Sequence, residues 1–338
     1  MRAAVDVMGG DHAPRAILQG CWDAAPLLEK NDSVLLVGDA QICTDALAAS
    51  DLPADKKSLY RVVAAADVIG MDESPVEAVR AKPNSSIAVM CKLAAAGEAD
   101  VVISAGNTGA CVAAAQLRMR TLPGIQRPGI AVVIPTFHGP VVLCDVGANP
   151  LPKPLHMKQY AIMAAAFSTA VCGIENPRVG LLSIGEEESK GTIAVKQTRH
   201  IMVDDPIINF YGNVEGRDLF KGVVDVVICD GFVGNVLLKF FEGTVEGLFR
   251  ELLASLQEMT PDLVDRISPV MKKVQTELDW RDYGGAPLLG VAGLCLICHG
   301  RSDARAIKNA IRVGKQLCGN GINEKIVAKI KASKQVEE

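Results

Sequence analysis

Six loops rich in glycine and asparagine carry most of the residues that could do chemistry in this chain. They read MGGDHAP from Met8, SAGNTGA from Ser104, DVGANP from Asp145, SIGEEESKGT from Ser183, YGNVEGRD from Tyr211 and DGFVGN from Asp230. Glycine lets backbone amides approach a ligand, and a helix that begins after such a loop adds partial positive charge. Asparagine supplies a neutral donor and acceptor. Together these loops suit a small anion and a polar carbonyl group.

Glycine and asparagine also serve tight turns that bind nothing. That explanation would suffice for a single loop. Six loops, each directly after a predicted strand, favour a ligand-binding rim, that is, a ligand site formed by the loops along one edge of the sheet. Parallel α/β sheets bind ligands in this way, at the carboxyl ends of their strands.

The usual signatures of other chemistries are missing. The chain contains neither GxGxxG nor GxxxxGK[ST], and the nearest match, residues 185–192, carries three glutamates that would repel a triphosphate. Lys190 in this loop is either a solvated lysine paired with a neighbouring glutamate or an anion ligand at a helix start. The five histidines lack metal-ligand spacing. His12 and His299 each adjoin a glycine turn, and each either donates to an anion or packs a loop.

The composition indicates an aliphatic α/β core. Of the 338 residues, 49% are hydrophobic and only 4% aromatic, which suits parallel strands covered by helices. The net charge of -4 comes without a basic stripe, so nucleic acid is excluded as a partner. Ten cysteines without framework spacing indicate reduced thiols and a cytoplasmic protein, and CxxCH at Cys295–His299 is interpreted as buried thiols. No segment is long and apolar enough to cross a bilayer.

Short apolar runs alternate with helical patterns, which predicts βαβ units and a mostly parallel sheet. The predicted strands are Ala3–Met8, Ser33–Val37, Tyr60–Ala65, Asp100–Ser104, Gly129–Pro135, Val141–Asp145, Arg178–Ile184, Pro206–Tyr211, Asp225–Cys229 and Leu288–Ile297. Helices are predicted over Ser86–Gly97, Leu155–Val171 and Thr192–Val203. The turn Phe137–Pro140 joins two strands without a helix, so we expect an antiparallel pair there.

One region departs from this alternation. From Val236 to Trp280 two consecutive amphipathic helices are predicted, with a break at Thr260–Pro261. We therefore expect a single α/β catalytic domain over 1–338 with a helical hairpin, 236–280, inserted in it. The hairpin packs on the core, forms a dimer interface or rests an apolar tip on a membrane. The tip candidates are Leu252, Leu253, Leu256, Met259 and Leu263.

The loops in series resemble one family, the bacterial phosphate acyltransferases, which are acyl-[acyl-carrier-protein]–phosphate transacylases. The resemblance lies in VDVMGGDHAP, SAGNTGA, CDVGAN, LLSIGEEESKGT, FYGNVEGRD, DGFVGNVLLK and YGGAPLLG, in order from Val5 to about Gly300. It implies transfer of a fatty acyl group from acyl carrier protein to inorganic phosphate, giving acyl phosphate for phospholipid synthesis. It also implies a Rossmann-like three-layer α/β/α fold, similar to phosphotransacetylases and isocitrate dehydrogenases, with a mostly parallel sheet.

The resemblance further implies a homodimer attached peripherally to the inner face of the cytoplasmic membrane, with no metal or organic cofactor. The implied partners are acyl carrier protein, phosphate and a downstream glycerol-3-phosphate acyltransferase. Because acyl carrier proteins are acidic, a basic landing surface is expected. Its candidates are Arg250, Arg266, Lys272 and Lys273 on the hairpin and Arg118, Arg120 and Arg127 elsewhere.

The residues fit this chemistry, because phosphate is already an oxyanion and a thiolate, with a free pKa of ~8.5, leaves without strong acid help. The site must place phosphate and stabilise the developing oxyanion. The family's pattern puts Lys190 and Asn235 at the reaction centre. The remaining candidates for phosphate or substrate binding are Gly9, Gly10, Asp11, His12, Gly106, Asn107, Thr108, Asn149 and Asn213.

Three rival functions share parts of this pattern. A phosphotransacetylase-type enzyme would use a short acyl-coenzyme A, but the hairpin and the MGGDHAP opening argue against it. A dehydrogenase would need a nicotinamide fingerprint or a metal-bound carboxylate cluster, and the sequence has neither. A non-catalytic membrane scaffold would not need the dense glycine and asparagine loops.

Overall fold

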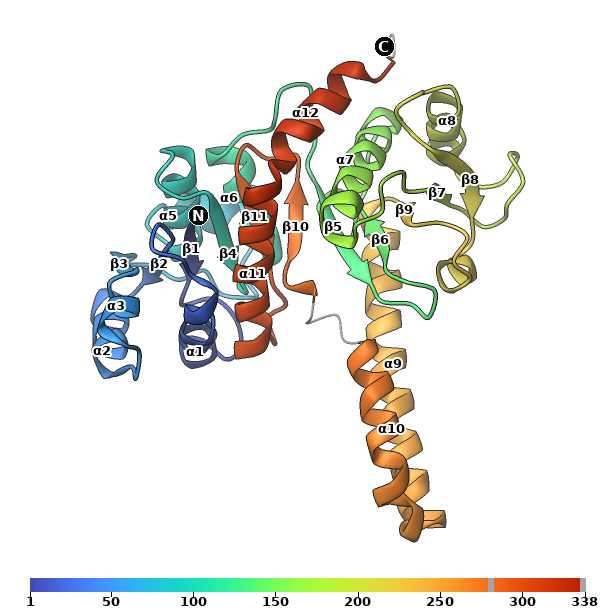
Figure 1. The fold of residues 1–338 in the computed structure, drawn as a ribbon. Coiled ribbons are helices and arrows are strands. Elements are labelled where there is room, and N and C mark those ends of the chain that lie inside the picture. The colour runs from blue at the N-terminus through green and yellow to red at the C-terminus, as the bar shows by residue number, and fades with distance from the viewer. Residues whose placement is uncertain (279–282, 335–338) are drawn as a thin grey trace.

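A computed structural model, which describes residues 1–278 and 283–334, contains one eleven-stranded sheet in the order β3-β2-β1-β4-β11-β10-β5-β6-β9-β7-β8 (Figure 1). The strands are β1 Arg2–Asp6, β2 Ser33–Gly38, β3 Tyr60–Ala64, β4 Val101–Ser104, β5 Gly129–Ile134, β6 Val141–Cys144, β7 Val179–Leu182, β8 Phe210–Val214, β9 Val226–Ile228, β10 Ala286–Leu289 and β11 Leu294–Ile297. Many of these strands are buried on both faces, which explains their continuous apolar runs.

Helices cover both faces of the sheet, so the fold is the expected three-layer α/β/α arrangement. The helices are α1 Arg15–Asp23, α2 Ala40–Ala49, α3 Ala54–Lys57, α4 Pro75–Ala81, α5 Ser86–Ala95, α6 Thr108–Arg118, α7 Pro154–Cys172, α8 Ile193–Met202, α9 Gly231–Met259, α10 Val264–Glu277, α11 Ala304–Asn320 and α12 Ile322–Ala332. One core cluster joins the sheet to α1, α7, α8, α11 and α12. The other joins it to α4, α5, α6 and the first turns of α9.

The two halves of the sheet run in opposite directions. In the first half, β1, β2, β3, β4 and β11 are parallel. Because β10 is antiparallel to both β11 and β5, and β6 is antiparallel to β5, the strands β6, β9, β7 and β8 point the other way. The antiparallel pair predicted around Phe137–Pro140 is therefore confirmed, and it is this pair that reverses the second half.

This reversal corrects the expectation of a single ligand-binding rim. The loops after β1 and β4 lie at one edge of the sheet, whereas those after β6, β7 and β9 lie at the opposite edge. The helix α9 connects the edges, since it begins after β9 and runs back along the sheet. At 1.5 Å per residue, Lys239 lies about 12 Å along α9 from Gly231.

Two predicted strands differ from the observed ones. The run Leu288–Ile297 is not one strand but two, β10 and β11, because Gly290 and Gly293 have positive φ and reverse the chain. The predicted strand Pro206–Tyr211 begins only at Phe210, since residues 205–208 form a turn. Asn213 consequently lies within β8, paired with Leu181 of β7, and not in a loop after the strand.

The helices α9 and α10 lie against each other and project from the sheet body as an antiparallel pair (Figure 1). The break falls at Thr260, as the sequence predicted, but α9 begins at Gly231 and not at Val236. Residues 279 and 280 of the predicted hairpin lie outside the described residues. None of the helices in the described part of the chain combines the length and apolar character that a membrane span needs.

Candidate active site

The first two glycine loops meet at the carboxyl ends of β1 and β4. A Cβ at Gly9 would lie 2.7 Å from the backbone nitrogen of Gly106, so only glycine permits this approach. The Asp6 carboxylate accepts hydrogen bonds from the Ser104 hydroxyl at 2.7 Å and the Met8 amide at 3.1 Å. Burial raises the pKa of Asp6. The contacts of the Asp6 carboxylate with Ser104 and Met8 therefore hold the two loops together.

The first loop is also fastened to the end of β11. Gly10 has a φ of 103°, and the Asp11 amide donates to the carbonyl oxygen of Gly300 at 2.7 Å. The side chains of Asp11 and His12 are exposed. The glycine turn is therefore held in place by its backbone, and the side chains of Asp11 and His12 remain at the surface.

Asn107 holds the second loop and the start of α6. Its Oδ1 accepts from the Ala110 amide at 3.0 Å, and its Nδ2 donates to three carbonyl groups of residues 70–73 at 3.1–3.2 Å. The hydrogen bonds of this side-chain amide thus hold the second loop, residues 70–73 and the start of α6 in place. The next residue, Thr108, is exposed at the first turn of the helix.

Asn149 has a comparable positioning role at the opposite edge. The buried Asp145 carboxylate accepts from the amides of Ile130 at 2.9 Å and Asn149 at 2.7 Å. The Asn149 side chain donates to the Pro128 carbonyl at 2.7 Å, and the backbone carbonyl of Asn149 accepts from the Gly231 amide at 2.9 Å. The start of α9, and with it Asn235, is therefore held by this loop.

The loop Ser183–Thr192 joins β7 to α8 and carries Lys190 at the surface. Asn213 supports it by donating from Nδ2 to the carbonyl oxygen of Glu187 at 2.9 Å. Thr192 caps the first turn of α8 with its side chain. A lysine two residues before a helix N-cap combines a full positive charge with the helix dipole, which favours an anion.

Two polar atoms associated with this loop are unusual. Ser183 Oγ and Asn213 Oδ1 are buried and have no hydrogen-bond partner within the described residues. Buried polar atoms normally have partners, because an unpaired one costs about 1–3 kcal/mol. Because both atoms are closed to solvent, they belong to the support of the Lys190 loop and are not presented to a ligand.

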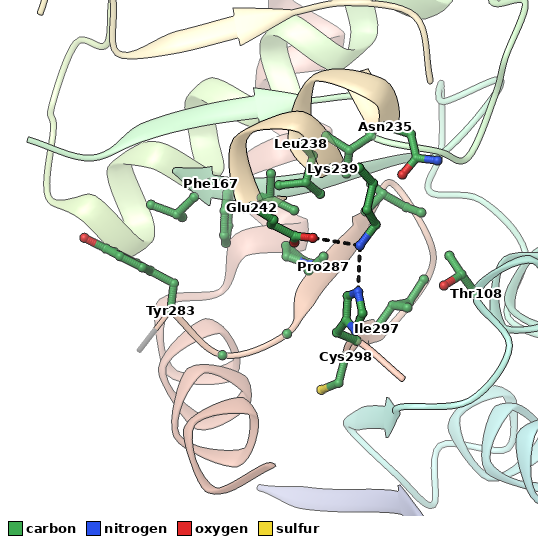
Figure 2. Close-up of a pocket in the computed structure, with 18 residues that line it drawn as sticks. Thr108, Phe167, Asn235, Leu238, Lys239, Glu242, Tyr283, Pro287, Ile297 and Cys298 are labelled. Atoms are coloured by element: carbon green, nitrogen blue, oxygen red, sulfur yellow. Dashed lines mark hydrogen bonds and ion pairs between the residues drawn. The ribbon is translucent and has the colours of Figure 1, made fainter. Parts of the chain in front are cut away.

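The first turns of α9 cover a cavity of about 140 Å³ (Figure 2). Its lining is mainly apolar, and its polar residues include Thr108 from the start of α6 and Asn235 and Lys239 from α9. Lys239 Nζ donates to Glu242 Oε2 at 2.9 Å and lies 2.6 Å from His299 Nε2. These two interactions hold the ammonium group at the cavity.

His299 is suited to accept from Lys239. Burial, followed by the nearby charge of Lys239, lowers the pKa of His299 from its usual 6.5. The ring is therefore neutral near pH 7, and because an ammonium group only donates, Nε2 is the acceptor. Lys239 and Glu242 are 48% and 16% exposed in their side chains, so the lysine faces solvent while its partner is shielded.

Cys298 also lines the cavity, but its thiol is not a nucleophile there. Burial raises the pKa of Cys298 to about 12. Because the thiolate is the reactive form, an acylated cysteine intermediate is not favoured at this position. Cys295 and Cys298 are both buried, as the sequence predicted for the CxxCH segment.

The structure brings together some of the predicted residues and separates others. Thr108 and Asn235 line the same cavity. The Lys190 loop instead faces a neighbouring side of α9, where Gly191 and Thr192 border an apolar groove of about 600 Å³. Within the described residues, no hydrogen bond or ion pair joins Lys190 to Asn235.

Lys239 and Glu242 line this cavity, and the sequence did not predict them as candidates. A usable signal was present, because Lys239 ends the motif DGFVGNVLLK and follows Asn235 by four residues, which puts both on one helix face. The pairing with His299 had no such signal, since that residue lies 60 positions further along the chain.

Comparison with known proteins assigns the family. The family described as "Fatty acid synthesis protein" matches residues 1–325. The phosphate acyltransferase of Desulforamulus reducens is 44% identical over 100% of both chains. That of Nitratidesulfovibrio vulgaris is 45% identical over 98% of this chain and 96% of its own. The chain belongs to the phosphate acyltransferase family. It is therefore an acyltransferase enzyme.

Solved structures support the fold of this acyltransferase. A phosphotransacetylase from Streptococcus pyogenes superposes with a TM-score of 0.61 at 15% identity, covering 95% of this chain and 94% of its own. A branched-chain phosphotransacylase from Enterococcus faecalis gives a TM-score of 0.57 at 13% identity, with coverage of 94% and 99%. The predicted Rossmann-like fold class is confirmed.

Proposed function

We propose that this acyltransferase moves a fatty acyl group from the thioester of acyl carrier protein to inorganic phosphate. The carbonyl C–S bond breaks and a C–O bond to phosphate forms. The carrier leaves as a thiolate, which takes a proton from solvent, and the product is an acyl phosphate for phospholipid synthesis. The observation that carries the proposal is an apolar cavity bordered by Thr108, Asn235 and the ammonium group of Lys239.

This arrangement matches the charge changes of the reaction. A hydrocarbon chain fits an apolar lining, whereas a thioester carbonyl needs donors where its negative charge develops. The Asn235 amide and the Lys239 ammonium are such donors on one face of α9. Lys190, on its exposed loop before α8, is proposed to bring its ammonium group to the phosphate that attacks this carbonyl.

A trapping experiment tests the proposed reaction. The purified chain is incubated with palmitoyl-[acyl-carrier-protein] and phosphate, and acyl phosphate is captured with hydroxylamine. We expect hydroxamate that depends on phosphate, with much weaker product from acetyl-coenzyme A. Strong turnover of acetyl-coenzyme A and none of the carrier thioester would indicate a phosphotransacetylase-type enzyme instead. No product from either thioester would overturn acyl transfer to phosphate.

The projecting hairpin is proposed to serve the partners of this reaction. The predicted landing residues for the acidic carrier are exposed, as are Leu252, Leu253 and Met259 among the tip candidates. Leu256 and Leu263 are half-buried. We infer a cytoplasmic homodimer that uses the hairpin for self-association and for peripheral membrane contact, and that passes acyl phosphate to a glycerol-3-phosphate acyltransferase.

The membrane role predicts a clear effect of charge at the hairpin tip. Leu252 is 46% and Met259 79% exposed, and each apolar side chain transferred from water to lipid contributes about 1.5–3 kcal/mol. A Leu252→Glu/Met259→Glu variant should therefore bind anionic phospholipid vesicles at least ~10-fold more weakly in a co-sedimentation assay. Leu117→Glu, at an exposed leucine of α6, should bind as the parent does. Equal binding by all three proteins would remove the hairpin from membrane contact.

A further inference from the structure

The cavity lies where the sheet divides between β5 and β10. These strands pair only through Leu288 with Ile130 and Leu289 with Gly129. Beyond that point β10 stays with β11, whereas β5 continues along β6. The remaining part of β5, from Ala131 to Ile134, therefore separates from β10 and leaves a gap in the middle of the sheet.

The lining shows that the cavity passes through this gap. Successive residues of a strand point to opposite faces, and Val132 and Val133 both border the cavity. Val132 packs with the cluster that includes α6, and Val133 belongs to the cluster that includes α7. The cavity thus connects the two faces of the sheet and is not a hollow on one of them.

Its two ends differ in chemistry. Figure 2 shows Thr108 and Asn235 on one side, Lys239 and Glu242 in the middle, and Phe167 with Tyr283 on the other side. Phe167 comes from α7 and is 1% exposed, so an aromatic ring of the core lines the far end. A molecule that fills the cavity must therefore have a polar end and an apolar end.

The volume sets how much of such a molecule can enter. Apolar protein cavities of about 150 Å³ hold one benzene molecule, or about six carbon atoms. The observed cavity of about 140 Å³ is of that size. A narrow passage through a sheet suits a single extended hydrocarbon chain.

We propose that this passage through the sheet binds about the first six carbons of the acyl chain, and that Val132 and Leu238, which line it, limit the chain length that it accepts. The proposal builds on the proposed acyl-transfer function, because the carbonyl group then lies beside Asn235 and Lys239. The apolar interior recognises the chain, and the ammonium group orients its polar end.

Binding of straight-chain carboxylates tests the passage without catalysis. Acetate, butyrate, hexanoate, octanoate and dodecanoate are titrated in competition with a fluorescent fatty acid. We expect affinity to rise about fourfold per methylene up to about hexanoate and then to level off, because each buried methylene contributes about that factor. Val132→Phe and Leu238→Phe should each weaken octanoate at least ~10-fold while leaving acetate within about twofold.

A matched control separates filling of the passage from a general effect of phenylalanine. Val203→Phe changes a 48% exposed valine after α8 and should keep the parental chain-length profile. If Val132→Phe and Leu238→Phe both fold and keep the parental chain-length profile, the passage does not bind the acyl chain. Chain-length-dependent binding without any transfer to phosphate would overturn the proposed function and leave the passage assignment standing. If acyl transfer to phosphate occurs but neither Val132→Phe nor Leu238→Phe changes the chain-length profile, the proposed function stands and the passage assignment is overturned.

Discussion

Replacing Lys190 by alanine is expected to lower turnover of acyl thioester and phosphate about 10²–10³-fold. This is the loss seen when one preorganised donor to a developing oxyanion is removed. Lys190 is exposed in a glycine-containing loop directly before α8, and the loop is supported by Asn213. The ammonium group is therefore free to meet an anion that the helix N-terminus also attracts. The measurement is the steady-state rate of phosphate-dependent hydroxamate formation.

Two further variants define what this result means. Lys196→Ala removes another exposed lysine, six residues along the chain within α8, and should keep parental turnover. Lys190→Arg retains the charge and should recover part of the activity, since its geometry differs from that of an ammonium group. Near-parental turnover by a folded Lys190→Ala protein would exclude this lysine from the mechanism.

Replacing Lys239 by methionine is expected to lower turnover about 10–10²-fold. Methionine has nearly the same side-chain length as lysine and a similar apolar stem, so the variant mainly removes the charge beside the cavity. A smaller effect than for Lys190 is expected because Glu242 at 2.9 Å already balances part of this charge. Separate titrations of thioester and phosphate measure the effect on kcat and on each KM.

The geometry around Lys239 also supplies its control. Lys325→Met changes an exposed lysine of α12, outside the proposed carrier and membrane surfaces, and should not alter catalysis. His299→Gln keeps an acceptor for the lysine and should retain more activity than Lys239→Met. If Lys239→Met leaves kcat and both KM values at parental levels, the lysine only packs against His299 and does not serve the reaction.

The sequence alone was sufficient for the general architecture and for the location of several chemical groups. Alternation of apolar runs and helical patterns is a local property, and it predicted βαβ units, most strands and the break at Thr260–Pro261. The three-layer fold was implied by the family resemblance. Glycine at positions such as Gly9 and Gly10 is required by local backbone geometry and close packing, so these loops were recognisable. The motif series also identified the family, because seven short segments in a fixed order are specific even when each one is not.

Tertiary structure alone decided which of these groups meet. The reversal at β5 and β6 puts the loops on two edges of the sheet, and a local pattern that shows strands does not show their direction. Asparagine recurs in the motifs with different roles. The side chains of Asn107 and Asn149 hydrogen-bond to backbone groups and hold loops in place, whereas Asn235 borders the cavity. Lys239 contacts His299 only because the folded sheet brings α9 beside the loop that follows β11. Hydrogen-bond partners and cavities depend on contacts between distant segments, and these form when the sheet is assembled.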